Sequence, residues 1–549
     1  MKQISKIKFR HFIKWIVFLL SGLWLNLVTC PYVFSETWID SVEVEETHLP
    51  VIIGRSENPV LKIKVYKNNH LQSSIEQIFL TIPDDTSSKY VDLLEVFFTA
   101  NNSEFSSEQL FGKAIKSEKQ NVISGHQPLE RGVNYFWVTV TLSEKTDLLA
   151  NIKLDCDKIS DSQNNHLTPL PHAVKGNRPA VGFHGDSAVY NHRIYFKNPG
   201  LITTNKGTLV AVFDMRHYKP LDSQADIDIG MSRSTDGGRT WEPVREVMDM
   251  GKAGGLPEDQ NGLTDPSILL DKSNNTIWIA ALWAQGFDKQ RIWTESRPGM
   301  SPEETGQLVL VKSEDDGQTW SSPINITSQI KDPSWHLLLQ GPGKGITLKD
   351  GTLVFPAQFK DAEEMPHSTI IYSRDHGETW HIGTGAKPNT TESQVVELQN
   401  GLLMLNLRDN RGGSRSVYIT NDMGKTWEEH PTSRKALPEP ICQASLINFL
   451  YDYKGIKKEL LLFSNPNTTV RDRRNITLKV SVDDGKTWPQ KYYTLLDAVV
   501  GAGYDRREFP MGYSCITQIN GHTAGIMYGS SRSDLVFQKV DIAEVLGNE

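Results

Sequence analysis

The residues of this chain that could do chemistry are carboxylates, arginines and a tyrosine in short, separate motifs. Asp222 lies in "KPLDSQADIDIG", Glu392 in "TTESQVVEL" and Tyr513 in "MGYSC". Carboxylates can transfer protons, and a phenol becomes a nucleophile when a neighbouring base takes its proton. Arg408 in "LMLNLRD" and Arg473 in "RDRRNITL" are permanent cations whose guanidinium groups can hold a carboxylate through two hydrogen bonds. These groups can bind an anion and move protons if the fold brings them together.

Metal, nucleotide and redox chemistry have no matching pattern. The four cysteines are widely spaced, with neither a disulfide framework nor a zinc-binding motif. The stretch "GPGKG" is rich in glycine, but it lacks the strand–GxxxxGK[ST]–helix context of a phosphate-binding loop and reads as a turn. We therefore expect no metal and no cofactor.

The N-terminal segment differs from the rest of the chain. A basic stretch, "MKQISKIKFRHF", precedes an apolar one, "IKWIVFLLSGLWLNLVTC", which is the layout of a secretory signal peptide over residues 1–35. The alternatives are a membrane anchor that is retained and a lipid attached to Cys30. We expect a secreted, periplasmic or cell-surface protein with no integral membrane span after signal removal. The net charge of −8 disfavours nucleic acid as a partner.

Residues 37–156 have the pattern of a β-sandwich. Short runs such as "PVLKIKVYK", "LLEVFFTA" and "NYFWVTVTL" are rich in β-branched and aromatic residues, and polar turns separate them. We expect a jelly-roll-like sandwich that could bind carbohydrate. The polar, proline-containing residues 157–178 are expected to form a linker.

A short turn recurs five times in residues 179–549. "STDGGRTW" begins at Ser234, and close copies begin at Ser313, Ser373, Thr420 and Ser481. Each copy follows a strand-like run and contains Asp-x-Gly-x-Thr-Trp, in which Asp bonds the turn, Gly accepts positive φ and Trp anchors the chain. Repeats at this spacing predict an all-β, six-bladed β-propeller, with one blade lacking the motif. These turns are expected to be architectural and to lie away from the site.

An ordered set of motifs resembles the bacterial exo-sialidases, which are retaining glycosidases that release terminal α-linked sialic acids. The motifs include "TTNKGTLVAVFD", "SRSTDGGRTWEP", "GLPEDQNGLTDPSILLD", "LMLNLRDNRGGSRSV" and "MGYSC". The resemblance covers residues 179–549, and "ERGVNYFWVTVTL" also resembles the sandwich that some of these enzymes carry. The turn alone is weak evidence, because other propellers use it, but the ordered combination is specific.

The resemblance assigns three catalytic roles. Tyr513 would be the nucleophile, because a neutral phenol avoids the repulsion that a carboxylate nucleophile would meet beside the substrate's own carboxylate. Glu392 would take the proton of Tyr513. Asp222 would be the acid–base that protonates the leaving oxygen and then activates water.

The resemblance also assigns substrate contacts. Arg408 and Arg473 would belong to a cationic clamp on the substrate carboxylate, with Arg471 or Arg474 replacing Arg473 if the loop is shifted. Two further positions, Arg216 and Asp265, match those that contact the substituents on the sugar ring.

One part of the family pattern is missing. The first clamp arginine of the family lies in a Phe/Tyr-Arg-Ile-Pro motif, where this chain reads "HRIYFKNPGL" and places Lys197. The family glutamate that holds this arginine is replaced by Gly529. Lys197 is therefore expected to supply a single charge to the clamp, with Arg193, carried inward by a bulge, as the alternative.

The expected function is that of an exo-α-sialidase acting on sialylated glycans, glycoproteins or glycolipids, most simply as a monomer. One alternative is a propeller hydrolase of another 2-keto sugar acid. A second is a non-catalytic sialic-acid lectin, which would need neither an acid nor a nucleophile.

Overall fold

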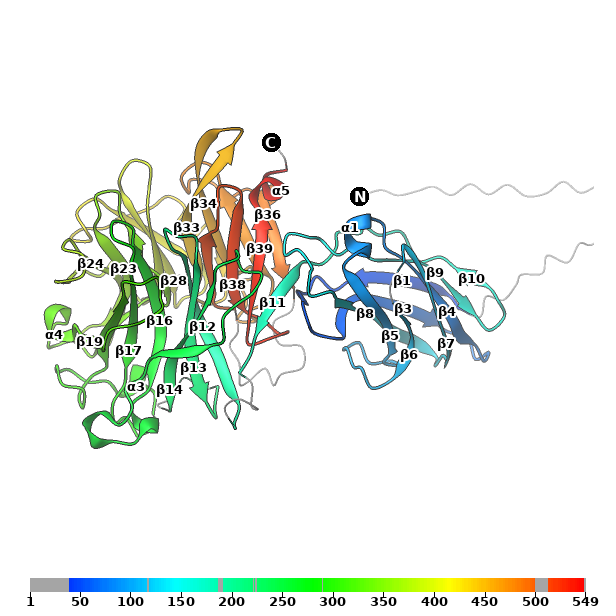
Figure 1. The fold of residues 1–549 in the computed structure, drawn as a ribbon, viewed down its shortest axis with the longest axis horizontal. Coiled ribbons are helices and arrows are strands. Elements are labelled where there is room, and N and C mark those ends of the chain that lie inside the picture. The colour runs from blue at the N-terminus through cyan, green and yellow to red at the C-terminus, as the bar shows by residue number, and fades with distance from the viewer. Residues whose placement is uncertain are drawn as a thin grey trace, which may run out of the picture.

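The protein consists of a β-sandwich joined to a larger β-propeller (Figure 1). The computed structural model describes residues 39–115, 118–185, 191–220, 222, 225–288, 290–498 and 512–547. The predicted signal segment and Cys30 lie outside the described residues. Cys156, Cys442 and Cys515 are buried and free of disulfides.

The sandwich is built from two antiparallel sheets that enclose an aliphatic and aromatic core. The first sheet has the order β1 (Ser41–Glu46), β3 (Asn58–Lys67), β8 (Gly132–Leu142), β5 (Val91–Phe98), β6 (Leu110–Ile115). The second has the order β10 (His166–Leu167), β9 (Asp155–Asp161), β4 (Ser74–Thr81), β7 (Gln120–Pro128). Alternate residues of β3, including Ile63 and Val65, are fully buried between the sheets, as the period of two in a strand requires.

The sandwich extends beyond the boundary expected at residue 156. Strand β9 crosses that position and pairs with β4, and β10 continues the sheet, so the first part of the expected linker is sheet. The expected linker contains "KISDSQNN", whose polar residues are typical of a loop, but Ile159 and Ser160 in it are buried in the sheet. Only the residues after β10 connect the two domains.

Six sheets form the propeller, and they confirm the predicted number of blades. In chain order of their first propeller strand, they are β2 (Val51–Ile52)–β11 (Pro179–Phe183)–β39 (Leu535–Asp541)–β38 (Thr523–Gly529)–β37 (Ser514–Gln518); β12 (Ile194–Thr203)–β13 (Leu209–His217)–β14 (Ile227–Ser234)–β15 (Arg245–Met248); β21 (Gly343–Lys344)–β16 (Leu263–Asp271)–β17 (Thr276–Trp283)–β18 (Gln307–Ser313)–β19 (Ile324–Asn325); β20 (Leu337–Gln340)–β23 (Leu353–Lys360)–β24 (Pro366–Ser373)–β25 (His381–Ile382), with β22 (Ile346–Thr347) on β23 and β26 (Lys387–Pro388) on β24; β27 (Thr390–Glu397)–β28 (Leu403–Asp409)–β30 (Ser416–Thr420)–β31 (Glu428–Glu429); and β33 (Ser445–Tyr453)–β34 (Ile456–Pro466)–β35 (Ile476–Ser481)–β36 (Tyr493–Asp497).

Short elements complete the described chain. They are the two-stranded pair β29 (Gly413–Ser414)–β32 (Pro438–Glu439) and the helices α1 (Asp85–Ser88), α3 (Ile292–Glu295), α4 (Thr327–Ile330), α5 (Ile542–Leu546), η1 (Ala253–Gly255), η2 (Glu258–Gln260) and η3 (Gln490–Tyr492). Within the described ranges, no helix has the length and apolar character needed to span a membrane.

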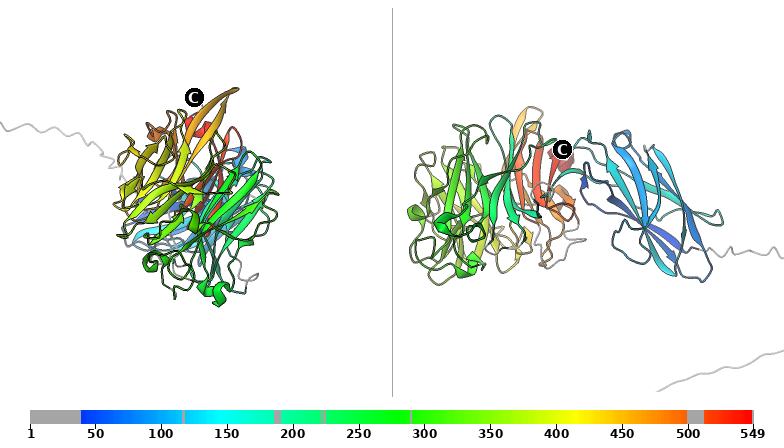
Figure 2. Two further views of the ribbon diagram at one scale, coloured as in Figure 1. Left: turned by 90° about the vertical axis from the view of Figure 1, so that its left-hand side faces the viewer. Right: turned by 60° about the horizontal axis from the view of Figure 1, so that its bottom comes forward.

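The first blade closes the ring and joins it to the sandwich. Strand β11, from the start of the propeller sequence, pairs antiparallel with β39 from its end, which locks the two termini of the ring together. On its other edge β11 pairs in parallel with β2, a strand contributed by the sandwich segment. The right-hand view in Figure 2 shows the sandwich, in blue, on the side of the propeller where the red C-terminal strands of this blade lie.

The recurring turns connect the third strand of a blade to its fourth. In the first copy, Thr240 donates its backbone N–H to Asp236 Oδ1 (2.9 Å) and its hydroxyl to Asp236 Oδ2 (2.6 Å), while Gly238 N–H donates to Ser234 Oγ (2.9 Å). The same contacts recur at the other four copies. Neighbouring strands of a blade run in opposite directions. The end of the third strand, with its turn, therefore lies at one edge of the blade, and the start of the first strand and the end of the second lie at the other edge.

The five tryptophans of these turns are not equally buried, and this predicts different costs of truncation. Trp380 is 2% exposed and packs on Trp278 and Phe355, whereas Trp427 is only half-buried. Trp380→Ala is therefore expected to lower the free energy of unfolding by ~3–5 kcal/mol, and Trp427→Ala by less. Urea denaturation measures both. KM should be unchanged in each folded variant, and lost activity without lost stability would contradict an architectural role.

Candidate active site

One end of the propeller gathers the predicted site residues around a cavity of about 560 Å³. The size is typical of small-molecule sites. Starts of first strands and ends of second strands meet there, on the side away from the recurring turns. Seven of the eight predicted side chains line it: Arg216, Asp222, Asp265, Glu392, Arg408, Arg473 and Tyr513.

Tyr513, Glu392 and Arg408 form a closed hydrogen-bonded group. Tyr513 lies immediately before β37, Glu392 lies in β27 and Arg408 lies in β28. The Tyr513 hydroxyl donates to Glu392 Oε1, and Arg408 Nη1 donates to both Tyr513 Oη (2.9 Å) and Glu392 Oε2 (2.5 Å). Burial and the Glu392 charge raise the pKa of Tyr513 well above its ordinary value, although Arg408 and Arg473 oppose them. The phenol is therefore neutral at rest and needs a base, and Glu392 is in contact with it.

Arg473 lies beside the same tyrosine. Its guanidinium carbon is 5.5 Å from the centre of the Tyr513 ring, and its Nη2 donates to Ile441 O (3.1 Å). Arg471 also lines the cavity, whereas Arg474 pairs with Asp472. Of the three arginines in this loop, the cavity therefore has Arg471 and Arg473.

Arg216 connects two carboxylates. It is 1% exposed at the end of β13, and it donates Nε (3.0 Å) and Nη2 (2.7 Å) to Asp214 Oδ2 and Nη1 to Asp222 Oδ1. Arg291 Nη2 donates to the other oxygen of Asp222 (3.0 Å). Burial favours the neutral acid, but Arg216, Lys197 and Arg291 outweigh it and hold the pKa of Asp222 below its ordinary value. These cations therefore favour the ionised form of Asp222.

Asp265 has the opposite tendency. Burial, together with the charges of Asp214 and Glu392, raises its pKa well above the ordinary value. Asn198 bridges the two aspartates, with Nδ2 donating to Asp265 Oδ1 (2.7 Å) and Asp214 Oδ2 (3.0 Å). A protonated Asp265 can donate a hydrogen bond to a ligand oxygen, which an ionised one cannot.

The eighth predicted residue, Lys197, has a different environment. Its Nζ donates to Pro220 O (2.7 Å), two residues before Asp222. Lys197 is not one of the described residues that line the cavity. Burial and the nearby Arg216 lower the pKa of Lys197 to about 8, against the attraction of Asp222. Its contact with a substrate carboxylate stays a prediction, and its observed contact is with the segment that carries Asp222.

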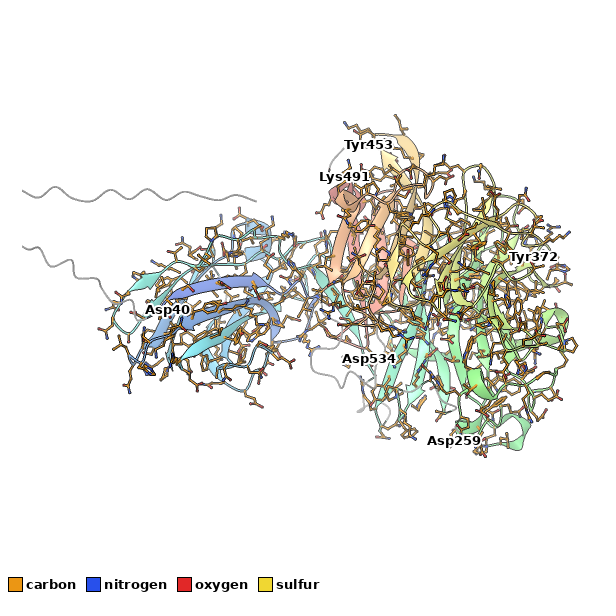
Figure 3. The ribbon with its side chains drawn as sticks, turned by 180° about the vertical axis from the view of Figure 1, so that it is seen from behind. Asp40, Asp259, Tyr372, Tyr453, Lys491 and Asp534 are labelled. Atoms are coloured by element: carbon orange, nitrogen blue, oxygen red, sulfur yellow. The ribbon has the colours of Figure 1, made fainter. Side chains whose placement is uncertain are left out.

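Asp534, which lies outside the matched family motifs, is one of the acids that attract Lys197. Gly529 pairs its N–H with Tyr513 O (3.0 Å) and offers no side chain. Asp534, labelled in Figure 3 on the side of the propeller nearer the sandwich, attracts Lys197 and accepts hydrogen bonds from Arg193 Nη2 (2.6 Å) and Phe196 N–H (3.4 Å). Arg193 is thus engaged at Asp534 rather than in the cavity lining.

The cavity is lined by cationic side chains and by a set of apolar side chains. Its cations are Arg216, Arg291, Arg408, Arg471 and Arg473. Its apolar wall is formed by Leu282, Ile292, Trp293, Leu337 and Leu339. Three buried lining atoms have no hydrogen-bond partner within the described part of the chain: Arg408 Nε, Gln358 Oε1 and Thr391 Oγ1. Buried polar groups are usually satisfied, so these atoms, together with the arginines, indicate a polar ligand that carries negative charge.

Sequence reasoning missed Asp214, Asn198 and Arg291. Asp214 precedes Arg216 by two residues on one strand, so its place on the same face was readable from strand periodicity. Asn198 and Arg291 carried no local signal, because a loop and a register shift between Lys197 and Gly200 decide where they lie.

Comparison with known proteins identifies the family of this chain. Residues 198–496, more than half of the chain, match the BNR repeat-like domain, and residues 39–165 match the N-terminal domain of BNR-repeat neuraminidase. A sialidase of Bacteroides fragilis is 41% identical over 92% of this chain and 96% of its own length. A sialidase of Clostridium perfringens is 31% identical over 64% of this chain and 90% of its own.

Solved structures show the same architecture. The Hadza microbial sialidase Hz136 superposes with a TM-score of 0.84 at 40% identity, covering 91% of this chain and 99% of that one. A Trypanosoma rangeli sialidase in complex with 2,3-difluorosialic acid, described as a covalent intermediate, has a TM-score of 0.51 at 20% identity, over 67% of this chain and 57% of that one, and shares the fold. With its two domains, its six blades and its cavity, this chain belongs to the family of BNR-repeat sialidases.

Proposed function

We propose that this protein is an exo-α-sialidase that hydrolyses terminal α-linked sialic acids through a covalent tyrosyl intermediate. The observation that carries the mechanism is the contact of the Tyr513 hydroxyl with Glu392, with Arg408 bonded to both, at the base of an arginine-rich cavity. A phenol with a raised pKa becomes nucleophilic only when a base removes its proton in the reaction.

The first step forms the bond between enzyme and sugar. Glu392 takes the phenolic proton as Tyr513 Oη attacks the anomeric carbon, and the bond to the leaving oxygen breaks with a proton from Asp222. Arg408 and Arg473 hold the substrate carboxylate. In the second step, Asp222 takes a proton from water, which attacks the same carbon, and Tyr513 departs with the proton returned by Glu392. Two displacements on one carbon retain the α-configuration.

Asp222 must gain a proton before it can act as an acid. Its partners Arg216 and Arg291 both line the cavity, so an anionic substrate competes for their charge. The substrate carboxylate also repels Asp222 and displaces water. All three effects raise the pKa of a carboxyl group, so the bound substrate itself favours the acid form.

The test is the stereochemistry of the first product. Hydrolysis of an α-sialyl-lactose followed by proton NMR should show the α-anomer of the free sugar first, with the β-anomer appearing later by mutarotation. Initial release of the β-anomer would exclude the double displacement. Absence of any turnover would favour a lectin, but a lectin has no use for the combination of Asp222, Glu392 and Tyr513.

The charge of Lys197 predicts a limb in the pH profile. Because its pKa is lowered to about 8, raising the pH through 8 removes a positive charge beside Arg216 and Asp222. KM for a sialoside should therefore rise above pH 8 in the parent enzyme. Lys197→Ala should have the high KM at all pH values, and Lys197→Arg, which stays charged, should lack the limb. Superimposable profiles of parent and Lys197→Arg would contradict this role.

The same proposal extends to substrate and compartment. Sialylated glycans, glycoproteins and glycolipids are the substrates that an open cavity with an arginine clamp can take, and the enzyme acts on them outside the cytoplasm as a monomer. The basic and apolar residues 1–35 support export. Carbohydrate binding by the sandwich is supported by its presence as a separate β-domain beside the catalytic one.

A further inference from the structure

Three donor groups lie side by side on the blade that carries Asp222. They are His217 at the end of β13, Asp228 in β14 and Glu246 in β15. One donor atom from each lies within 4.8 Å of the other two. In the ranges that the structure describes, no other three His, Cys, Asp or Glu side chains converge in this way.

The sheet itself brings these side chains to one face. Met215 lies opposite Asp228, and Gly230 lies opposite Glu246. Residues opposite one another in an antiparallel pair, and residues two apart on one strand, project from the same side. His217, two residues after Met215, therefore shares a face with Asp228 and Glu246. The positions of the donors follow from strand register rather than from a loop.

The imidazole of His217 is held in the orientation that a metal ligand needs. Its Nε2 lies 3.0 Å from Asp228 Oδ2, and its Nδ1 lies 2.8 Å from His192 Nε2. His192 in turn stacks on Tyr218 at 4.1 Å between ring centres. A metal-bound histidine commonly donates its second ring N–H to a fixed acceptor, which sets the tautomer, and an unprotonated His192 Nε2 can accept this bond from outside the group of three.

We propose that His217 Nε2 and the carboxylates of Asp228 and Glu246 bind a divalent metal ion of the zinc class. A set of one imidazole and two carboxylates suits zinc, with water completing the coordination. Donor atoms at ~2.0–2.2 Å from one tetrahedral ion lie ~3.3–3.6 Å apart, so donor atoms separated by up to 4.8 Å have to move closer together when the ion binds. His217 and Asp228 are buried, and the exposed side chain of Glu246 is free to turn inward and close the site.

The ion would act at the base of the catalytic loop. His217 ends β13 and Asp228 lies in β14, and the connection between these two strands carries Asp222. An ion bound by both strand ends would link the two ends of the segment that carries Asp222. The sequence showed no such site because its ligands come from three strands and form no short motif.

Calorimetric titration of Zn²⁺ into the full chain, after treatment with a chelator, tests the proposal without reference to activity. One equivalent should bind, and Tm should rise with Zn²⁺ concentration. Glu246→Gln, an exposed and isosteric change, should weaken binding at least ~10-fold, and His217→Gln should do the same. His367→Gln is the matched control, because His367 Nε2 also lies 2.8 Å from a carboxylate, that of Asp361, but on another blade.

The opposing outcomes are equally definite. Absence of stoichiometric binding to the parent chain would overturn the proposal. Equal affinities of the parent and Glu246→Gln would overturn it even if His217→Gln failed to fold. Ca²⁺ binding as tightly as Zn²⁺ would indicate a site made of carboxylates alone and would overturn the assignment of His217 as a ligand.

Discussion

Tyr513→Phe is expected to reduce kcat for sialoside hydrolysis by at least ~10³-fold while the protein stays folded. The substitution removes only the oxygen that contacts Glu392 and Arg408, and the ring beside Arg473 is retained. The ion pair of Glu392 and Arg408 also survives, so no buried charge is left alone. Loss of a nucleophile removes the covalent route itself and is among the largest single effects in enzymes of this kind.

Tyr528→Phe is the matched control for this experiment. Tyr528 is a fully buried tyrosine of β38, paired with Ser514, which follows Tyr513 directly, and its hydroxyl donates to Gln538 Oε1 (3.0 Å) rather than to a cavity residue. It should keep parental kcat and lose at most a modest amount of stability, about 1–3 kcal/mol for the unpaired group. If Tyr513→Phe retained parental kcat, or if both variants lost it equally, Tyr513 would not be the nucleophile.

Asp222→Ala is expected to lower kcat/KM by ~10²–10⁴-fold on a natural sialoside and much less on an activated aryl sialoside. An alkoxide leaving group needs a proton, whereas an activated phenolate departs with little help. The structure adds a second expectation. Asp222→Ala removes the carboxylate that Arg216 Nη1 and Arg291 share, so the affinity for an anionic ligand should not fall and KM should stay level or decrease.

Initial rates on the two substrates measure the first effect, and inhibition by a non-hydrolysable anionic analogue measures the second. Asp226→Ala, a carboxylate four residues further along the chain, is the control and should behave as the parent on both substrates. Equal losses on the natural and the activated substrate would exclude Asp222 as the acid.

The repeated turn shows what local sequence can determine. In "STDGGRTW", the hydrogen bonds that define the turn join residues no more than four apart, from Asp236 to Thr240 and from Ser234 to Gly238. Such contacts form wherever the local sequence permits, so five copies were enough to predict six blades. The border of the sandwich shows the limit, since β9 is a strand only because β4 and β10 lie beside it.

The three residues of the candidate catalytic group could be predicted from the sequence for a different reason. Tyr513, Glu392 and Arg408 each lie at a strand end within a recognisable motif, and the blades carry strand ends to one rim. The sequence by itself thus determined an all-β chain with a sandwich, a propeller, and the residues that match a tyrosine-based site.

Tertiary structure alone decided the environment of those residues. Lys197 contacts Pro220 O, and the acids that attract it are Asp222, Asp214 and Asp534 rather than a residue at position 529. Arg291 reaches Asp222 from a distant loop. His217, Asp228 and Glu246 converge through strand register. Contacts of this kind join residues far apart in the chain, so their distances depend on how strands pair and loops fold back. The charge state of a side chain depends in turn on those distances and on burial, which is why neither the ionised Asp222 nor the lowered pKa of Lys197 could be read from residue order.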